Sequence, residues 1–224
     1  MKDRKVKAWL WVVVNLVVIA LALFIAAGTV RYWQAWVHLG VVGVSGIPLA
    51  LYISNDPILL ENRTKVGPTA EQRPIQKIIV LGLGLPAVAV FIVPGLDHRF
   101  GWSSVPPWLS LAGDLLILTA MWMSFRVFRE NSFGSATIEV AEGQKVASTG
   151  PYAIVRHPMY SSAAVYLIAV ALALGSFWAL IPALLTILGL VVRLLDEEKF
   201  LAKNLAGYTD YCAKLRWRLM PGIF

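Results

Sequence analysis

Residues 8–27 form a run of twenty residues without one charged side chain. A helix of this length rises 1.5 Å per residue and crosses the hydrocarbon core of a bilayer, which is about 30 Å thick. Five more apolar segments are long enough to cross or nearly cross, at 33–53, 76–96, 106–125, 158–174 and 177–195. The composition agrees, because 58% of the residues are hydrophobic and only 15% are charged. We therefore predict an all-α integral membrane protein, a single domain over residues 1–224 with about six transmembrane helices.

The last two segments are short and are separated only by Gly175-Ser176-Phe177-Trp178. We expect a tight helical hairpin whose first arm is tilted or falls short of a full crossing. The first segment has the positive start of a signal peptide, but its apolar core is longer than such peptides carry. We interpret it as an uncleaved signal anchor.

Lys and Arg residues fall almost entirely on one side of the predicted bundle. Four lie before residue 8, four at 63–77, four at 126–156 and six at 193–218, which leaves Arg31 and Arg99 for the opposite side. Positive residues in short loops stay in the cytoplasm. We expect both termini and the polar segments to face the cytoplasm. The net charge of +7 then suits an anionic lipid surface and needs no nucleic acid to explain it.

Two long polar segments could carry chemistry. Residues 54–75 are rich in turns, and we interpret them as a solvated connector. In the second segment, 126–157, residues 136–140 alternate in polarity and predict a short strand. This segment ends at His157-Pro158, and proline is favoured in the first turn of a helix. We expect Pro158 to begin the fifth helix, whose free N–H groups would suit an anion.

Two groups of ionisable residues near the apolar segments have two interpretations each. Arg193 and Glu197 are four residues apart, so they share a helix face and form either an ion pair or part of a site. Asp114 lies inside the fourth segment and is either functional or hydrogen-bonded to another helix, with Ser110, Thr119 and Ser124 nearby.

Several kinds of site find no support in the sequence. Cys212 is the only cysteine and the three histidines lie far apart, so we predict no metal site and no disulfide. Glycines 40, 43 and 46 in the second segment are interpreted as helix-packing residues rather than a cofactor loop. After Glu198, apolar residues at helical spacing predict an amphipathic helix, interrupted at Gly207, that lies in the interface or folds back over the site.

The motif order resembles that of a known enzyme family. Gly150-Pro151-Tyr152 is followed by Arg156-His157-Pro158-x-Tyr160, a span, Arg193-x-x-x-Glu197-Glu198 and two tyrosines close to Gly207. This pattern, dense from Asn131 to Pro221, resembles the isoprenylcysteine carboxyl methyltransferases and their bacterial relatives. The resemblance implies an enzyme of a bacterial inner membrane that uses S-adenosyl-L-methionine. Its transmembrane helices are expected in 1–130 and its cofactor-binding and catalytic part in 131–224.

The resemblance also implies roles for individual residues. Arg193 matches the arginine that handles the acceptor's carboxylate, so it is the expected catalytic and substrate-binding residue. The expected cofactor-binding residues are Gln144, Lys145, Val146, Ala147, Tyr152, His157, Pro158, Met159, Tyr160 and Glu197. The expected reaction is O-methylation of a carboxylate on a lipophilic acceptor at the cytoplasmic face, with membrane lipids as the surroundings.

Three alternatives remain open. A phospholipid or amine N-methyltransferase shares much of the motif and would favour acidic and aromatic residues around the acceptor. An NADPH-dependent sterol-type reductase would need several cations for the phosphates, and the adjacent Glu197 and Glu198 argue against it. A transporter or scaffold would place its charged residues nearer the middle of the bilayer.

Overall fold

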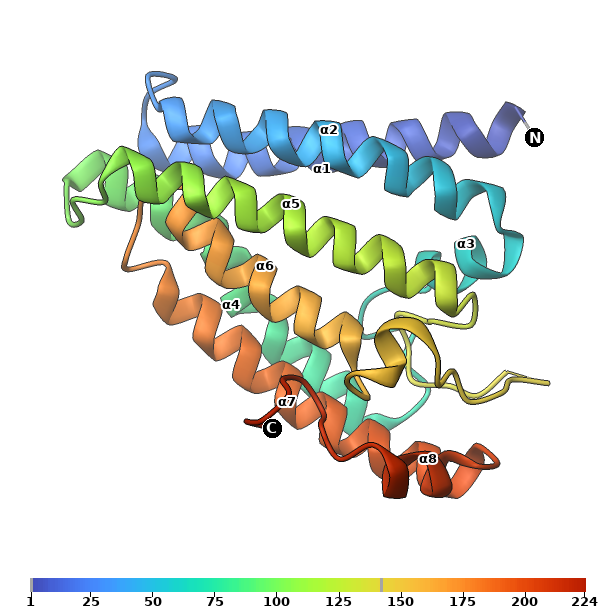
Figure 1. Ribbon diagram of the computed structural model, residues 1–224. Coiled ribbons are helices and arrows are strands. Elements are labelled where there is room, and N and C mark those ends of the chain that lie inside the picture. Colours follow the sequence, from blue (N-terminus) through green and yellow to red (C-terminus); the bar gives the residue numbers. More distant parts are fainter. Residues whose placement is uncertain (1, 142) are drawn as a thin grey trace.

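Long helices lie side by side and are joined by short loops at one end of the bundle and by long connections at the other (Figure 1). The computed structural model describes residues 2–141 and 143–224. Its six long helices are α1 (Lys2–Ala27), α2 (Trp33–Asn55), α4 (Pro74–Phe100), α5 (Pro107–Glu130), α6 (Pro158–Ala173) and α7 (Leu180–Asn204). The connections hold α3 (Pro57–Thr64), the 3-10 turn η1 (Gly150–Ala153) and α8 (Tyr208–Lys214). No β-strand occurs in the described ranges, so the predicted all-α fold is confirmed.

Four helices are long and apolar enough to cross a membrane, namely Trp9–Ala27 of α1, and α2, α4 and α5. The apolar helix α6 has only 16 residues, which corresponds to about 24 Å. Charged residues occupy the second half of α7, from Arg193 onward. Large apolar side chains such as Leu85, 81% exposed, cover the outer surface, as expected where lipid surrounds a protein. The structure thus agrees with an integral membrane protein, with four full-length spans where six were predicted.

Small residues allow the closest helix contacts. A Cβ atom on Gly113 of α5 would lie 2.5 Å from the backbone nitrogen of Ala173 in α6, far inside normal contact distance. The glycines predicted to pack helices behave differently. Gly43 has a side-chain carbon of Leu16 3.4 Å from its Cβ position, but Gly40 and Gly46 have no neighbour within 4 Å among the residues described. That prediction is therefore wrong for two of three glycines, because the faces of α2 that carry them do not meet a helix.

Asp114 is buried in α5, and neither of its carboxylate oxygens has a hydrogen-bond partner in the described part of the chain. The predicted bond between helices is made by other residues. Ser124 of α5 and Ser162 of α6 share a hydrogen bond of 2.6 Å, and the Ser162 hydroxyl lies 2.7 Å from the carbonyl oxygen of Ala120. Serine hydroxyls therefore link α5 and α6 near Ala120 and Ser124.

Three short loops, 28–32, 101–106 and 174–179, meet at the left end of the bundle in Figure 1. The Asp97 carboxylate joins two of them, because it accepts hydrogen bonds from the Ser103 backbone and hydroxyl, both at 2.6 Å, and from the Ser176 hydroxyl. Gly175 turns the chain with φ of +69°, which suits glycine. The predicted tight hairpin between α6 and α7 is confirmed.

The opposite end of the bundle carries the long connections, and here the predicted strand at 136–140 is wrong. These residues are irregular, because their backbone groups find partners other than a neighbouring strand. The Ala136 N–H donates to the Asn62 carbonyl at 3.1 Å, and the Ile138 N–H donates to the Glu71 carboxylate at 3.3 Å. Alternating polarity here reflects contacts with α3 and with the segment before α4.

Candidate active site

The motif from Gly150 to Tyr160 forms a turn followed by the start of α6. As predicted, Pro158 is the first residue of α6, with His157 in the capping position. Gly150 has φ of +56°, and a Cβ atom there would lie 2.7 Å from a carboxylate oxygen of Glu130. The positive φ favours glycine at this position, where η1 lies against the end of α5.

Glu198 ties the C-terminal tail to the start of α6. Its carboxylate lies 3.2 Å from His157 Nε2, 3.2 Å from Arg156 Nη2 and 2.9 Å from Arg218 Nε. The tail adds backbone bonds, since the Arg156 and His157 N–H groups donate to the carbonyls of Trp217 and Arg218, both at 2.9 Å. The side chains of Glu198 and His157 therefore bond to each other and to the tail in this structure.

Glu197 faces a different set of residues. Its Oε2 accepts a hydrogen bond of 2.6 Å from the Tyr160 hydroxyl, and within the described chain nothing bonds to its Oε1. Tyr152 stands nearby, with its hydroxyl 3.2 Å from the Asn131 amide nitrogen and its carbonyl accepting from the Tyr211 hydroxyl at 2.7 Å. The structure thus brings together Tyr152, Tyr160 and Glu197, three of the predicted cofactor-binding residues.

The predicted amphipathic helix beyond α7 folds back over this site. Gly207 has φ of +80° and separates α7 from α8, as expected from the sequence. Leu205, Tyr208 and Tyr211 form a buried cluster that also contains Val146. The remaining residues predicted at 144–147 lie at its margin, where Gln144 accepts from the Ala141 N–H at 2.9 Å, Lys145 is exposed and Ala147 is half-buried. Met159 is half-buried and Pro158 is buried at the start of α6.

Arg193, the predicted substrate-binding residue, is 7% exposed, and its guanidinium is bonded to other residues of the protein. Its Nη2 pairs with Glu71 at 2.6 Å and donates to the Ala136 carbonyl at 2.8 Å, and its Nη1 donates to Gln76 at 2.9 Å. The pair with Glu197 that the four-residue spacing allowed is not formed, because Glu71 lies closer.

The segment before α4 therefore belongs to the site, and its interpretation as a solvated connector is wrong. Glu71 and Gln76 are buried against Arg193. Arg73 makes two hydrogen bonds to Asp196, of 2.5 and 3.0 Å, and Gln76 bonds to the same carboxylate. One signal could have revealed this contact. Arg193 and Asp196 follow a long apolar run and need counter-charges, and Glu71 and Arg73 shortly before Pro74 can supply them.

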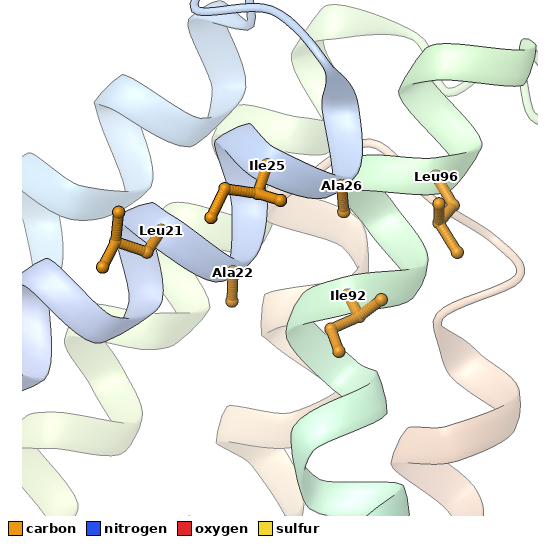
Figure 2. A pocket seen from close by; sticks show the side chains of 6 residues that line it. All are labelled: Leu21, Ala22, Ile25, Ala26, Ile92 and Leu96. Carbon is orange, nitrogen blue, oxygen red and sulfur yellow. The ribbon is translucent and has the colours of Figure 1, made fainter.

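A hollow of about 300 Å³ lies between α1 and α4, far from these polar residues. Figure 2 shows that Leu21, Ala22, Ile25 and Ala26 of α1 face Ile92 and Leu96 of α4. These residues lie near the ends of α1 and α4, whereas Gln76 of the polar site lies at the start of α4. The hollow is purely apolar and carries no group that could perform chemistry.

Residues 108–207 match the family model for phospholipid methyltransferases. This range runs through α5, α6 and α7 and contains Tyr152, Tyr160, Arg193 and Glu197. No curated protein matches the chain. Together with the long apolar helices, the family match supports a membrane methyltransferase.

Proposed function

We propose that this protein transfers a methyl group from S-adenosyl-L-methionine to a lipophilic acceptor at one face of a bacterial inner membrane. The observation that carries the proposal is the meeting of Tyr152, Tyr160 and Glu197 inside the range that matches the methyltransferase family. These residues lie at the end of the bundle where the polar connections gather. We further propose that this end faces the cytoplasm, because it holds most of the Lys and Arg residues.

The side chains fit the groups of S-adenosyl-L-methionine. Tyr152 and Tyr160 offer aromatic rings for the adenine. One oxygen of Glu197 has no partner among the described residues and could bond to a hydroxyl or ammonium group. Arg63 adds a cation whose Nε is buried without a partner in the part of the chain described, so an anionic group could be accommodated there. When bound, S-adenosyl-L-methionine supplies an electrophilic methyl group on sulfur.

The residues would act by binding and orientation. Methyl transfer is an in-line displacement, so holding the acceptor atom in line with the methyl group supplies much of the rate enhancement. Tyr160 holds Glu197 by a hydrogen bond of 2.6 Å, which keeps the carboxylate in place for this purpose. The folded-back α8 covers the turn at Tyr152 and limits the access of water.

For the acceptor we propose a carboxylate, which would be O-methylated, because the order of motifs resembles that of isoprenylcysteine carboxyl methyltransferases. A carboxylate is already ionised at neutral pH, so no general base is required. Nη1 and Nη2 of Arg193 are bonded to Glu71, Gln76 and Ala136. Arg193 would therefore not contact the acceptor itself but would position the residues around it.

The amine headgroup of a phospholipid is the second candidate acceptor. Two observations favour it: the family match itself, and the pairing of Arg193 with Glu71, which removes a free cation from the place expected to clamp a carboxylate. The free oxygen of Glu197 and the two tyrosines would suit a positively charged group.

The reaction class is tested by calorimetric titration of the detergent-purified protein with S-adenosylhomocysteine and, separately, with NADPH. We expect micromolar binding of S-adenosylhomocysteine only, lost in Glu197→Ala and kept in Glu61→Ala, a change at an exposed acid. Binding of NADPH alone would favour the sterol-type reductase, and binding of neither ligand would contradict the proposed function.

The acceptor class is tested by methyl transfer from radiolabelled S-adenosyl-L-methionine to N-acetyl-S-farnesylcysteine or to phosphatidylethanolamine. A methyl ester releases labelled methanol in base, whereas an N-methyl group does not. Label that base releases as methanol would support the carboxylate, and base-stable label in phosphatidylethanolamine would support the amine.

A further inference from the structure

Arg63 lies in the last turn of α3, a short helix in the connection between α2 and α4 (Figure 1). Asp56 caps the start of α3, because one carboxylate oxygen accepts from the N–H groups of Ile58 and Leu59, both at 3.1 Å. Leu59 is fully buried, and the Asn62 carbonyl accepts from the Ala136 N–H at 3.1 Å. These contacts fix the backbone that carries Arg63 relative to the 131–157 connection.

The Arg63 guanidinium points into the protein without a carboxylate partner. Its Cζ lies 4.4 Å from the centre of the Phe128 ring, a cation–π contact. A Cβ atom on Gly134 would lie 3.3 Å from Nη2, so the glycine leaves room for the guanidinium. The Nε atom is buried without a hydrogen-bond partner, and Arg63 forms no salt bridge in the described ranges.

The residues around Arg63 are those proposed to form the site. Burial lowers the pKa of Arg63 to about 10, while the nearby Tyr152, Tyr160 and Glu197 favour its charged form. Arg63 therefore stays charged at neutral pH. Glu197 is near Arg63 but forms no salt bridge with it, and the buried Nε lacks a partner in the described chain, so a ligand that brings a negative group into direct contact would be bound favourably here.

Arg193 is less suited than Arg63 to bind an anionic ligand, because its charge is already paired with a carboxylate. Its Nη1 and Nη2 are both bonded, and its partner Glu71 lies 2.6 Å away. A carboxylate at that distance cancels most of the field that a second anion would meet. Arg63 differs from Arg193 in this respect, because its Nε has no hydrogen-bond partner in the described chain and no carboxylate pairs with it there.

We propose that Arg63 is an anion-binding residue of this site and receives a carboxylate or phosphate group of a ligand. The inference rests on the proposed function. The methyl donor carries a carboxylate, and each candidate acceptor carries an anion, a carboxylate in the first class and a phosphate in the second. In every case the Arg63 guanidinium would bind an anionic group. The two experiments below distinguish whether that group belongs to the methyl donor or to the acceptor.

The first experiment compares wild type, Arg63→Gln and Arg63→Lys by titration with S-adenosylhomocysteine and with methylthioadenosine, which lacks the amino-acid end. If Arg63 holds the donor's carboxylate, Arg63→Gln weakens S-adenosylhomocysteine binding about tenfold or more and leaves methylthioadenosine unchanged. Arg129→Gln is the matched control, because Arg129 lies over the Phe125 ring of the same helix but is exposed.

The second experiment covers the acceptor. With S-adenosylhomocysteine bound, the proteins are titrated with N-acetyl-S-farnesylcysteine, its carboxamide and a short-chain phosphatidylethanolamine. If Arg63 holds the acceptor's anion, Arg63→Gln weakens binding of the farnesylated acid or the phospholipid about tenfold or more and leaves the uncharged carboxamide unchanged.

The outcomes separate the two proposals. Unchanged affinity for every ligand in a folded Arg63→Gln protein overturns the role of Arg63 and leaves the proposed function standing. A wild-type protein that binds none of the nucleoside ligands overturns both. If Arg63→Gln does not fold, Arg63→Lys decides, because it keeps the charge but loses Nε and the forked geometry. The lysine variant should bind the anionic ligand several-fold more weakly than wild type, and wild-type affinity for all ligands would overturn the inference.

Discussion

Arg193 and Glu71 form a buried ion pair, with 2.6 Å between Nη2 and Oε1, although they are 122 residues apart in the chain. The pair fastens the second half of α7 to the segment before α4. Arg73 and Asp196 repeat this link one helical turn later, with their closest atoms 2.5 Å apart. The end of the bundle that carries the site is thus held by charges from distant parts of the sequence.

Removing one partner of the buried pair should destabilise the protein. Arg193→Met leaves Glu71 buried without a counter-charge, a loss we expect to cost about 3 kcal/mol. The double variant Arg193→Met/Glu71→Leu should recover much of this loss, measured by thermal unfolding in detergent. Glu61→Gln, which removes one of the two carboxylate partners of Lys65 at the surface, should leave the unfolding midpoint unchanged. Additive effects of the two changes at 193 and 71 would contradict a coupled pair.

Tyr160→Phe should weaken binding of S-adenosylhomocysteine about tenfold, because Glu197 loses the hydroxyl that holds it at 2.6 Å. The measurement is calorimetric titration of the folded variant. Tyr166→Phe provides the control, since Tyr166 belongs to the same helix but packs against the hydrophobic core. Equal affinity of the two variants would show that Tyr160 does not position Glu197 for the ligand.

Two glycine-to-alanine changes should have opposite effects on stability. Gly113→Ala places a methyl group 2.5 Å from the Ala173 backbone and forces α5 and α6 apart, which should cost about 1–3 kcal/mol. Gly84→Ala in α4 meets nothing within 4 Å among the described residues and should be neutral or stabilising. Thermal unfolding of both variants checks this. A stable Gly113→Ala protein would mean that the helices can separate at little cost.

The attachment of the C-terminal tail should weaken in acid. Burial of Glu198 opposes its ionisation, but hydrogen bonds from His157 and Arg218 outweigh burial and hold its pKa below 4.5. A carboxyl with a lowered pKa contributes its full stability above pH 4.5 and loses it as the pH falls through the folded-state pKa.

Hydrogen exchange at residues 216–220 should therefore accelerate below pH 4.5 beyond the intrinsic trend. Glu198→Gln should show fast exchange there already at neutral pH. A tail that remains protected in Glu198→Gln would show that its backbone bonds to Arg156 and His157 suffice.

The proposed orientation in the membrane can be tested with single cysteines. Val66 and Val30 are each 64% exposed and lie in loops at opposite ends of the bundle. With Cys212 replaced by serine, a membrane-impermeant maleimide should label Val30→Cys in intact cells and Val66→Cys only after lysis. The reverse pattern would invert the topology that the positive residues predict.

Much of the fold could be predicted because it depends on local properties of the chain. A backbone in hydrocarbon must satisfy its own hydrogen bonds, so long apolar runs become helices. The first residue of α6 was predicted for a similarly local reason, since proline restricts the residue before it and favours the first turn at Pro158. The strand at 136–140 failed because alternating polarity does not reveal whether a neighbouring strand exists.

Part of the candidate site could also be predicted, and the remainder could not. The resemblance carried by the order of motifs selected Tyr152, Tyr160 and Glu197, which the structure brings together. It could not reveal Arg63 or Glu71, because both belong to a segment whose turns and charges look like those of any solvated loop. Their role depends on which groups of other helices lie opposite them.

The sequence by itself determined which segments are helical and which end of the bundle gathers the charged residues, because hydrophobic run length and residue spacing act locally. Only the tertiary structure decided that Arg193 is paired with Glu71, and that Nε of Arg63, near Tyr160 and Glu197, has no partner in the described chain. The reason is geometric. Partners of a buried charge are set by how the helices pack, and packing joins residues 122 positions apart that no local pattern relates.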